Sequence, residues 1–199
     1  MKKTTLLLLL TITISFSQTK KTKKLLAQIE GEWKLDDNNN ITYIRIIEDI
    51  DLNKDEMYTR ALEYFTYNYG NGKSVLQVQD KDKGLIIGKG LYSKTHIGFS
   101  LVSYIFDTWH ILRVDIKNNK VRIILSLTYY DFTVSGGSSP DTHSKVLIAN
   151  SFPVNPKGRL KNQFSKAFYG SHLRAQKTLL EIEKAIKKGN TFSVKKDDW

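Results

Sequence analysis

The chain of 199 residues predicts an α+β protein, in which one early helix and a long C-terminal helix cover an antiparallel sheet. Alternating apolar residues, typical of strands, recur between residues 40 and 134, and a helical stripe interrupts them once, after the first strand. A second helical pattern lies close to the end of the chain. These patterns predict a sheet of about five strands with one apolar face. Amphipathic helices that pack on this face give the layers of an α+β protein.

The first strand is predicted over residues 40–50, which alternate and are rich in β-branched and aromatic residues. Asn53 follows, with Glu56 three residues later, and this spacing is typical of a helix N-terminus. The predicted helix runs over 53–69, and Gly70 ends it. Its apolar stripe comprises Met57, Tyr58, Ala61, Leu62, Phe65 and Tyr69.

Four further strands are predicted, a hairpin over 74–79 and 85–93 and two longer strands over 103–116 and 121–134. A loop and a short segment over 135–154 follow. The residues expected to face the core are Tyr104, Phe106, Leu112, Val114 and Ile116 in the first long strand and Val121, Ile123, Leu125, Leu127 and Tyr129 in the second.

The last helix is predicted over 160–188. Gly170 interrupts its apolar stripe and predicts a kink or a break, because glycine is about 1 kcal/mol less favourable than alanine inside a helix. Lys187 and Lys188 suit the negative end of the helix dipole, and Gly189 is a typical residue to end the helix.

Residues 1–17 have the pattern of a secretory signal peptide, with two lysines, the apolar run 6–14 and then small residues. The run is shorter than the roughly 20 residues that a membrane-spanning helix needs, so an uncleaved anchor is the less favoured alternative. We expect an exported protein, periplasmic or secreted, without a transmembrane segment in its mature chain. The organisation predicted for that chain is a basic arm and lead-in over 18–39, a single α+β domain over 40–188 and a tail over 189–199.

The charge is strongly basic, with a formal net charge of +11 and a pI near 9.6. Lysines gather at 20–24 and again over 184–196. An exported basic protein meets anionic lipid, lipopolysaccharide and acidic glycans rather than nucleic acid, although the charge can also serve solubility alone. The chain has no cysteine, which excludes disulfides and thiolate chemistry.

The stretch "DKGLIIGKGLYSK" resembles a phosphate-binding loop at first sight, with Gly84, Gly88, Lys89 and Gly90. The spacing is one residue short of that motif, Leu91 stands where Ser or Thr would bind magnesium, and a strand follows instead of a helix. Glycines on one face of a strand instead predict a bend or the close approach of a helix.

Three motifs together resemble an uncharacterised family of exported bacterial proteins, a domain of unknown function with a TBP-like fold. They are Tyr58, Ala61 and Tyr64 in the early helix, Ile86 to Gly90 in the hairpin, and Lys120 with Arg122 at the start of a strand. The resemblance covers roughly residues 41–133 and implies a β-α-β4-α order, with no assigned activity and no functional residues. Gly31 and Trp33 are similar to the start of lipocalins, so a lipocalin-like β-barrel is the alternative fold, which the helix over 53–69 disfavours.

No catalytic or metal-binding signature is present, so we expect a protein that is not an enzyme and holds no cofactor. The four histidines, His96, His110, His143 and His172, do not pair at metal-ligand spacing, and there is no nucleophile elbow. His110 lies on the predicted core face, where it is either a hydrogen-bonded core histidine or a ligand contact.

Two functional hypotheses follow, with an unrecognised hydrolase as a third. In the first, the sheet and the C-terminal helix bind a ligand or an envelope partner, in the sharpest form an apolar small molecule near Tyr104, His110 and Tyr129. The aromatic residues of the long strands could equally fill a core. In the second, the protein is structural and its basic segments contact anionic envelope surfaces.

Overall fold

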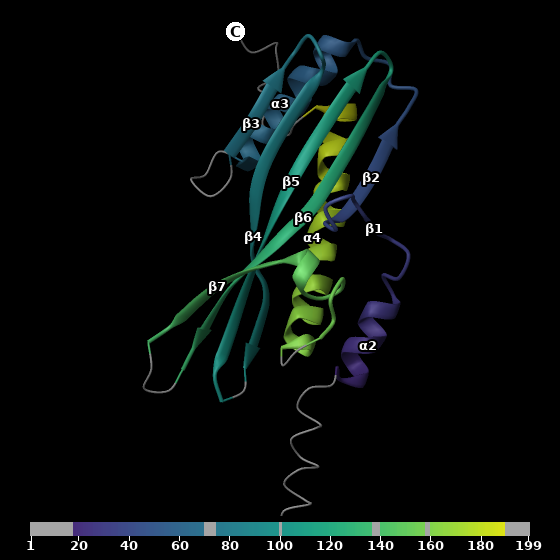
Figure 1. Cartoon of the computed structure of the whole chain (residues 1–199). Coiled ribbons are helices and arrows are strands. Elements are labelled where there is room, and N and C mark those ends of the chain that lie inside the picture. Colours follow the sequence, from purple (N-terminus) through teal and green to yellow (C-terminus); the bar gives the residue numbers. More distant parts are fainter. Residues whose placement is uncertain (1–17, 70–74, 100, 137–139, 158–159, 190–199) are drawn as a thin grey trace, which may run out of the picture. The chain divides into compact units, whose positions relative to one another are not determined.

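The computed structural model describes residues 18–69, 75–99, 101–136, 140–157 and 160–189 (Figure 1). The predicted signal peptide, Gly70 and all but the first residue of the predicted tail lie outside these residues. The elements in chain order are α2 (Lys20–Ala27), β1 (Lys34–Leu35), β2 (Ile41–Ile47), α3 (Lys54–Tyr69), β3 (Val75–Asp80), β4 (Leu85–Phe99), β5 (Ser103–Lys117), β6 (Lys120–Ser135), β7 (Thr142–Leu147), the 3₁₀ turn η1 (Ile148–Asn150) and α4 (Lys161–Lys188). None of the helices in the described part of the chain is both long enough and apolar enough to cross a membrane.

The sheet has the strand order β1-β2-β6-β5-β4-β3, and β7 pairs with β6. The β3–β4 and β6–β7 pairs are antiparallel, so the predicted hairpin and the α+β fold class are confirmed. The described residues form seven strands instead of about five. The sequence did not reveal β7 because all its side chains are exposed or half-buried, which leaves no apolar face to detect. The open strand order is incompatible with the lipocalin-like barrel.

The fold divides into two compact units that exchange segments along the chain. Among the described residues, the first unit comprises 18–41, 92–99, 101–108, 128–136, 140–157 and 160–173, and the second comprises 42–69, 75–91, 109–127 and 174–189. The strands β4, β5 and β6 and the helix α4 therefore contribute residues to both units, and each unit is described below by itself.

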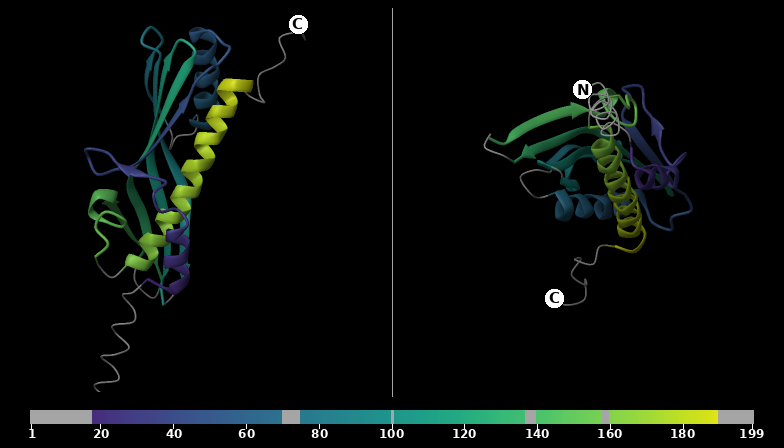
Figure 2. Two further views of the ribbon diagram at one scale, coloured as in Figure 1. Left: turned by 90° about the vertical axis from the view of Figure 1, so that its right-hand side faces the viewer. Right: turned by 90° about the horizontal axis from the view of Figure 1, so that it is seen from below.

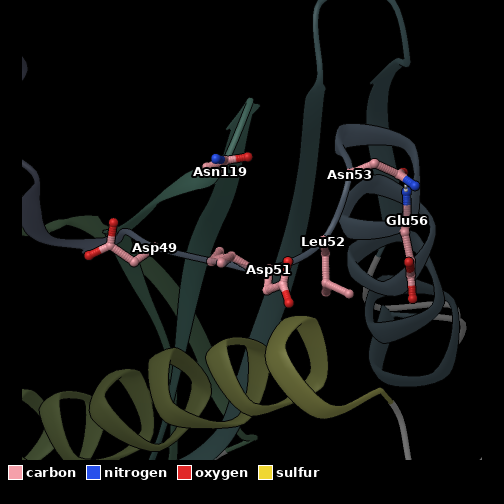
Figure 3. Close-up of a pocket in the computed structure, with 7 residues that line it drawn as sticks. Asp49, Asp51, Leu52, Asn53, Glu56 and Asn119 are labelled. Carbon is pink, nitrogen blue, oxygen red and sulfur yellow. Dashed lines mark hydrogen bonds between the residues drawn. The ribbon is translucent and has the colours of Figure 1, made fainter.

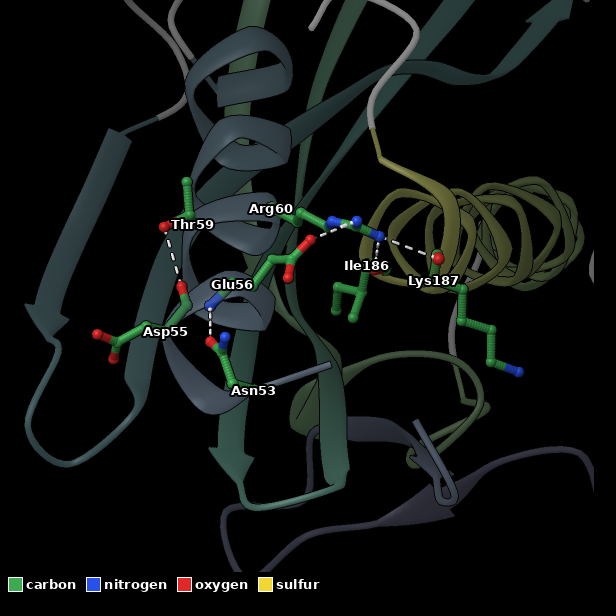
Figure 4. Close-up of polar contacts among 7 residues, drawn as sticks. All are labelled: Asn53, Asp55, Glu56, Thr59, Arg60, Ile186 and Lys187. Carbon is green, nitrogen blue, oxygen red and sulfur yellow. Dashed lines mark hydrogen bonds and ion pairs between the residues drawn. The ribbon is translucent and has the colours of Figure 1, made fainter. Parts of the chain in front are cut away.

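In the second unit, α3 begins where its sequence predicts. The Asn53 side chain accepts a hydrogen bond from the Glu56 backbone N–H at 2.8 Å, which satisfies one of the free donors of the first turn (Figure 4). The Glu56 carboxylate binds Arg60 at 2.6 Å, and the same guanidinium donates to the Ile186 and Lys187 carbonyls at the end of α4. Arg60 thus satisfies carbonyls that the last turn of a helix leaves without partners.

The glycines of β4 allow α3 to approach the sheet closely, as their position predicts. A Cβ atom at Gly88 would lie 2.6 Å from the Phe65 ring. At Gly90 it would lie 2.7 Å from the His110 ring and 2.8 Å from the Tyr69 ring. Both glycines sit inside a continuous strand, so they form a packing surface for aromatic rings.

In the first unit, Gly170 does not break α4, so the prediction of a break was wrong. The helix is continuous over its 28 residues (Figure 2). A Cβ atom at Gly170 would collide with the backbone carbonyl oxygen of Thr95 in β4. The Thr95 carbonyl therefore occupies the space that a side chain at position 170 would need, and only glycine fits there. The two residues are far apart in the chain, so the helical pattern gives no sign of this contact.

The buried face of β6 changes along the strand. Val121, Ile123, Leu125 and Leu127 are buried in alternation, and then Tyr130 and Phe132 continue the buried face. Two consecutive half-buried residues, Thr128 and Tyr129, shift the alternation by one position. The prediction that Tyr129 faces the core was therefore wrong. The rings of Phe106, Tyr130, Phe132 and Phe164 contact one another and fill the core of the first unit.

Candidate functional site

The segment expected to be a basic arm begins with the short helix α2, which presents lysines to solvent. Thr19 caps the helix by accepting a hydrogen bond from the Thr22 backbone N–H at 3.2 Å. Thr22 is the buried residue of α2, and its hydroxyl donates to Asn162 of α4 at 2.9 Å. Figure 2 shows α2 alongside the first turns of α4 in its left view. Because Thr22 turns inward, the four lysines of α2 are exposed.

The first half of α4 adds two more lysines beside α2. We use the term basic face for Lys20, Lys21, Lys23, Lys24, Lys161 and Lys166. Neither α2 nor residues 161–173 contain an aspartate or a glutamate. The Asn162 carbonyl oxygen also accepts the Thr19 backbone N–H at 3.2 Å, which fixes the start of α2 against the start of α4. Positive charge on α2 and on the first half of α4 is therefore concentrated without a counter-charge inside these two segments. The glutamates of α4, Glu181 and Glu183, lie in its second half.

A cavity of about 330 Å³ opens within the basic face. Its lining residues come from α2, β4 and α4 and are Lys21, Thr22, Leu25, Thr95, His96, Lys166, Tyr169 and Gly170. The His96 ring forms a 2.6 Å hydrogen bond with Gln163, and burial, with Lys166 acting in the same direction, lowers the pKa of His96. The imidazole is thus neutral at neutral pH, and the two lysines supply the charge of this cavity.

A second cavity, of about 310 Å³, borders the other residues of α2. Its walls include Leu26, Trp33, Phe152 and Phe168. The Trp33 and Phe168 rings meet edge to face at 5.5 Å, and the Phe152 ring lies 5.8 Å from Phe168. This cavity is therefore partly aromatic, and Lys23 and Glu30 also line it.

The largest of the cavities described lies in the second unit and is acidic. It measures about 630 Å³ and includes Asp49, Asp51 and Glu56 (Figure 3). Figure 3 shows these three carboxylates pointing in different directions. Nowhere in the described ranges do three or more histidine, aspartate or glutamate side chains gather in a geometry that could hold a metal ion. Among the residues that the structure describes, this cavity therefore holds no group of three side chains placed to ligate a metal ion.

His110, one of the predicted site residues, is buried in the second unit with 3% of its surface exposed. Its Nε2 atom and the Tyr69 hydroxyl share a hydrogen bond of 2.6 Å. Burial lowers the pKa of His110 to about 3, so the ring is neutral. Of the two possibilities that the sequence left open, these contacts describe a hydrogen-bonded core histidine.

Tyr104 and Tyr129, the other predicted site residues, lie half-buried in the first unit. Lys145 lies over the Tyr129 ring at 5.7 Å from its centroid, and Tyr129 pairs with Leu147 across β6 and β7. The three cavities described above are lined by other residues. Ligand binding at Tyr104, His110 and Tyr129 stays a prediction.

The remaining histidines have separate partners. His143 shares a 2.9 Å hydrogen bond with the Thr133 hydroxyl. His172 is buried and lies 3.1 Å from the Glu32 carboxylate, and burial lowers the pKa of His172 although Glu32 acts to raise it. Each histidine of the described chain is therefore part of a local pair.

Sequence reasoning identified the charge of residues 20–24 and missed the helix. The available signal was Thr19, a residue that caps helices, before a run of lysine, leucine and alanine. The position of α2 depends on its hydrogen bonds with Asn162. That residue is too far along the chain for a local pattern to indicate the contact.

Comparisons with known proteins agree with this fold. Residues 43–131 match a family described as a domain of unknown function (DUF4468) with TBP-like fold. No curated protein matches the chain. A crystal structure of a TBP-like protein from Parabacteroides distasonis ATCC 8503 is similar with a TM-score of 0.55 and 14% identity, covering 79% of this chain and 98% of that one. A DUF4468 family protein from Bacteroides ovatus ATCC 8483 is similar with a TM-score of 0.53 and 12% identity, covering 83% and 95%. At these identities the likeness extends to the fold alone.

Proposed function

Residues 43–131 belong to the DUF4468 family of TBP-like domains, and from this premise we propose that the protein is an exported, non-enzymatic module that binds an anionic surface of the cell envelope. The family supplies a fold and no activity, so the proposal is carried by one observation of this chain. That observation is the basic face, where α2 and the first half of α4 adjoin and present lysines, with no acidic residue in either segment.

The electrostatics favour a surface over a small ion. A lysine close to an anionic membrane contributes about 1 kcal/mol, so several lysines that reach one surface together give useful affinity. Attraction of this kind is screened by salt over roughly 8 Å at physiological ionic strength. Because the lysines lie on adjoining helices, a broad anionic surface can contact them at the same time.

Binding rather than catalysis is supported by the surroundings of the titratable groups. The four histidines form separate pairs with a tyrosine, a glutamine, a threonine and a glutamate. The carboxylates of the acidic cavity diverge (Figure 3). The hydrolase alternative would rest on a hydroxyl beside a histidine, as in Thr133 with His143, and that pair is exposed to solvent.

The apolar-ligand alternative has weaker support in the first unit. The contacting rings of Phe106, Tyr130, Phe132 and Phe164 occupy the core on which that hypothesis depends. Native mass spectrometry of the mature chain tests this alternative, because a bound apolar molecule would appear as an added mass that disappears on denaturation.

The proposal is tested with the chain from residue 18 and vesicles of phosphatidylcholine containing phosphatidylglycerol. Changing Lys20, Lys21, Lys23 and Lys24 to glutamine should weaken binding roughly 100-fold or more, because each lysine contributes about 1 kcal/mol at such a surface. Co-sedimentation over a range of vesicle concentrations measures the affinity.

The matched control changes four exposed lysines of the second unit, Lys117, Lys120, Lys184 and Lys188, to glutamine. The two variants have equal net charge, so only the position of the lysines differs. The control should bind nearly as well as the unaltered chain. Equal loss of affinity in both variants would show a non-specific effect of net charge and would contradict the proposal.

A further inference from the structure

The hairpin that joins β4 to β5 carries large apolar side chains in solvent. Phe99 is 79% exposed, Leu101 is 99% exposed and Ile97 is 42% exposed. Ile97 and Phe99 point to the same side of β4 because they are two positions apart. A single exposed apolar residue is ordinary in a soluble protein, whereas a group of them at one tip marks an interaction surface.

The opposite side of this strand is attached to the start of α4. The His96 ring binds the Gln163 side chain at 2.6 Å, and Gly98 leaves the space that the same Gln163 side chain occupies. Asn162, the neighbouring residue in α4, holds the start of α2 through Thr22. We use the term apolar tip for Ile97, Phe99 and Leu101. Through Asn162 and Gln163, α4 therefore binds both the helix α2 of the basic face and the strand β4 that leads to the apolar tip.

The figures show the same arrangement within the first unit. The β4–β5 hairpin, the start of α2 and the start of α4 lie at one end of this unit in Figure 1, and the left view of Figure 2 agrees. The hairpin that contains Phe99 and Leu101 thus lies at the end of this unit where α2 and α4 begin.

Apolar side chains beside lysines match the chemistry of a bilayer interface. Proteins bind there by burying apolar groups at the boundary of headgroups and acyl chains, while cationic side chains bind lipid phosphates. Polysaccharides and other hydrophilic polyanions offer charge without an apolar layer, so they would leave Phe99 and Leu101 in water.

We propose that the anionic partner is a phospholipid bilayer, and that Phe99 and Leu101 insert into it while the basic face binds the lipid phosphates. This inference rests on the proposed function and narrows its partner to one class. Insertion adds a component of affinity that does not depend on salt, because burial of apolar surface is not screened by ions.

The first experiment compares the double variant Phe99→Ser, Leu101→Ser with a matched control, Ile44→Ser, Ile46→Ser. The control removes two apolar residues of β2, which are 58% and 60% exposed, from the second unit. The tip variant should bind vesicles of phosphatidylcholine and phosphatidylglycerol roughly tenfold or more weakly, with the larger deficit at high salt, and the control should bind as the unaltered chain does. Both variants should bind immobilised dextran sulfate with unchanged affinity.

A second experiment measures insertion directly. The chain has no cysteine, so Leu101→Cys and Ile44→Cys each provide one site for an environment-sensitive fluorophore. The label at position 101 should shift to the blue on vesicles and be quenched by lipids that carry a quencher in the acyl chain. The label at position 44 should do neither.

The outcomes separate the two proposals. If the tip variant binds vesicles as well as its control and the label at 101 stays in water, the bilayer inference is wrong, while loss of binding in the α2 lysine variant would still support an anionic surface. If the α2 lysine variant also binds normally, the proposed function fails. If the tip variant changes the oligomeric state in gel filtration and the label reports burial without vesicles, the tip is a self-association surface and the inference is overturned.

Discussion

At the scale of single residues, burial decides what His110 can do. The ring lies inside the second unit against the Tyr69 hydroxyl, at 2.6 Å. An interior of low dielectric disfavours the charged imidazolium, and burial lowers the pKa of His110 to about 3. The side chain therefore serves as a neutral hydrogen-bonding partner, and its titration becomes linked to folding.

We predict that His110 makes the protein sensitive to acid. The pKa falls from 6.5 to about 3 on folding, so the unfolded chain binds a proton that the folded chain does not between these values. The free energy of unfolding then decreases as the pH falls from 6.5 toward 3, by up to about 1.4 kcal/mol per pH unit. We expect the free energy of unfolding, measured with urea, to decrease between neutral pH and pH 4. This decrease should be ~3 kcal/mol smaller for His110→Gln than for the unaltered chain.

The control for this prediction is Tyr69→Phe, which removes the hydroxyl partner and keeps the buried imidazole. Its pH dependence should stay as steep as that of the unaltered chain, because burial is the cause of the lowered pKa. Equal pH dependence for His110→Gln and the unaltered chain would contradict the prediction.

Gly90 gives a second prediction at this scale. A Cβ atom there would lie 2.7 Å from His110 and 2.8 Å from Tyr69, which is too close for either ring. Gly90→Ala should lower the free energy of unfolding by about 1–3 kcal/mol, the usual cost of overpacking. Thermal and urea unfolding measure the change. The exposed Ser93→Ala in the same strand should stay within about 0.5 kcal/mol, and a Gly90→Ala variant of equal stability would show that the rings can move aside.

At the scale of elements, the residues that identify the family are mostly packing residues. Tyr58, Ala61 and Tyr64 are buried on α3. Arg122 binds Asp115 at 2.9 Å, and Arg113 binds the same carboxylate at 2.7 Å. Burial acts to raise the pKa of Asp115, but the two arginines prevail and lower it. These motif residues thus take part in packing and ion pairing that assemble the fold.

The helix α4 supplies a prediction at the element scale. Alanine in place of Gly170 would favour an isolated helix by about 1 kcal/mol. In the folded chain its Cβ atom would meet the Thr95 backbone carbonyl, which cannot turn aside as a side chain can. We expect Gly170→Ala to destabilise the protein by roughly 2 kcal/mol in urea unfolding. Leu180→Ala, at a position 57% exposed on the same helix, is the control and should have a small effect. A stabilised Gly170→Ala would contradict this account.

At the scale of the whole molecule, the net charge of +11 is unevenly distributed over the chain. Acidic residues are frequent elsewhere in the chain, as in the cavity of Asp49 and Asp51, and are missing from the basic face. The proposed function places the anionic surface at this local excess of positive charge. Lysine keeps its charge far above neutral pH, whereas histidine does not.

We therefore predict that vesicle binding depends on salt and hardly on pH. Between about pH 6 and pH 9 the affinity should change less than roughly threefold, because binding through amines, unlike binding through an imidazole, does not change over this range. Raising the ionic strength from about 0.05 M to 0.5 M should lower it more than roughly tenfold. Co-sedimentation with phosphatidylglycerol vesicles measures both. A sharp loss of binding between pH 6 and 7.5 would instead show that a histidine carries the interaction.

The sequence by itself determined the α+β class, the start of α3 at Asn53, the two long strands and the end of α4, where Gly189 has φ +80° and donates to the Ala185 carbonyl at 2.9 Å. Each depends on local patterns, which are residue periodicity and the capping of helix ends. Tertiary structure alone decided that α4 continues through Gly170 and that Tyr130, instead of Tyr129, faces the core. It also decided that α2 is held by a hydrogen bond to Asn162. It also placed the β4–β5 hairpin and the starts of α2 and α4 at one end of the first unit. These features arise from contacts between residues far apart in the chain, whose energies a local pattern does not encode.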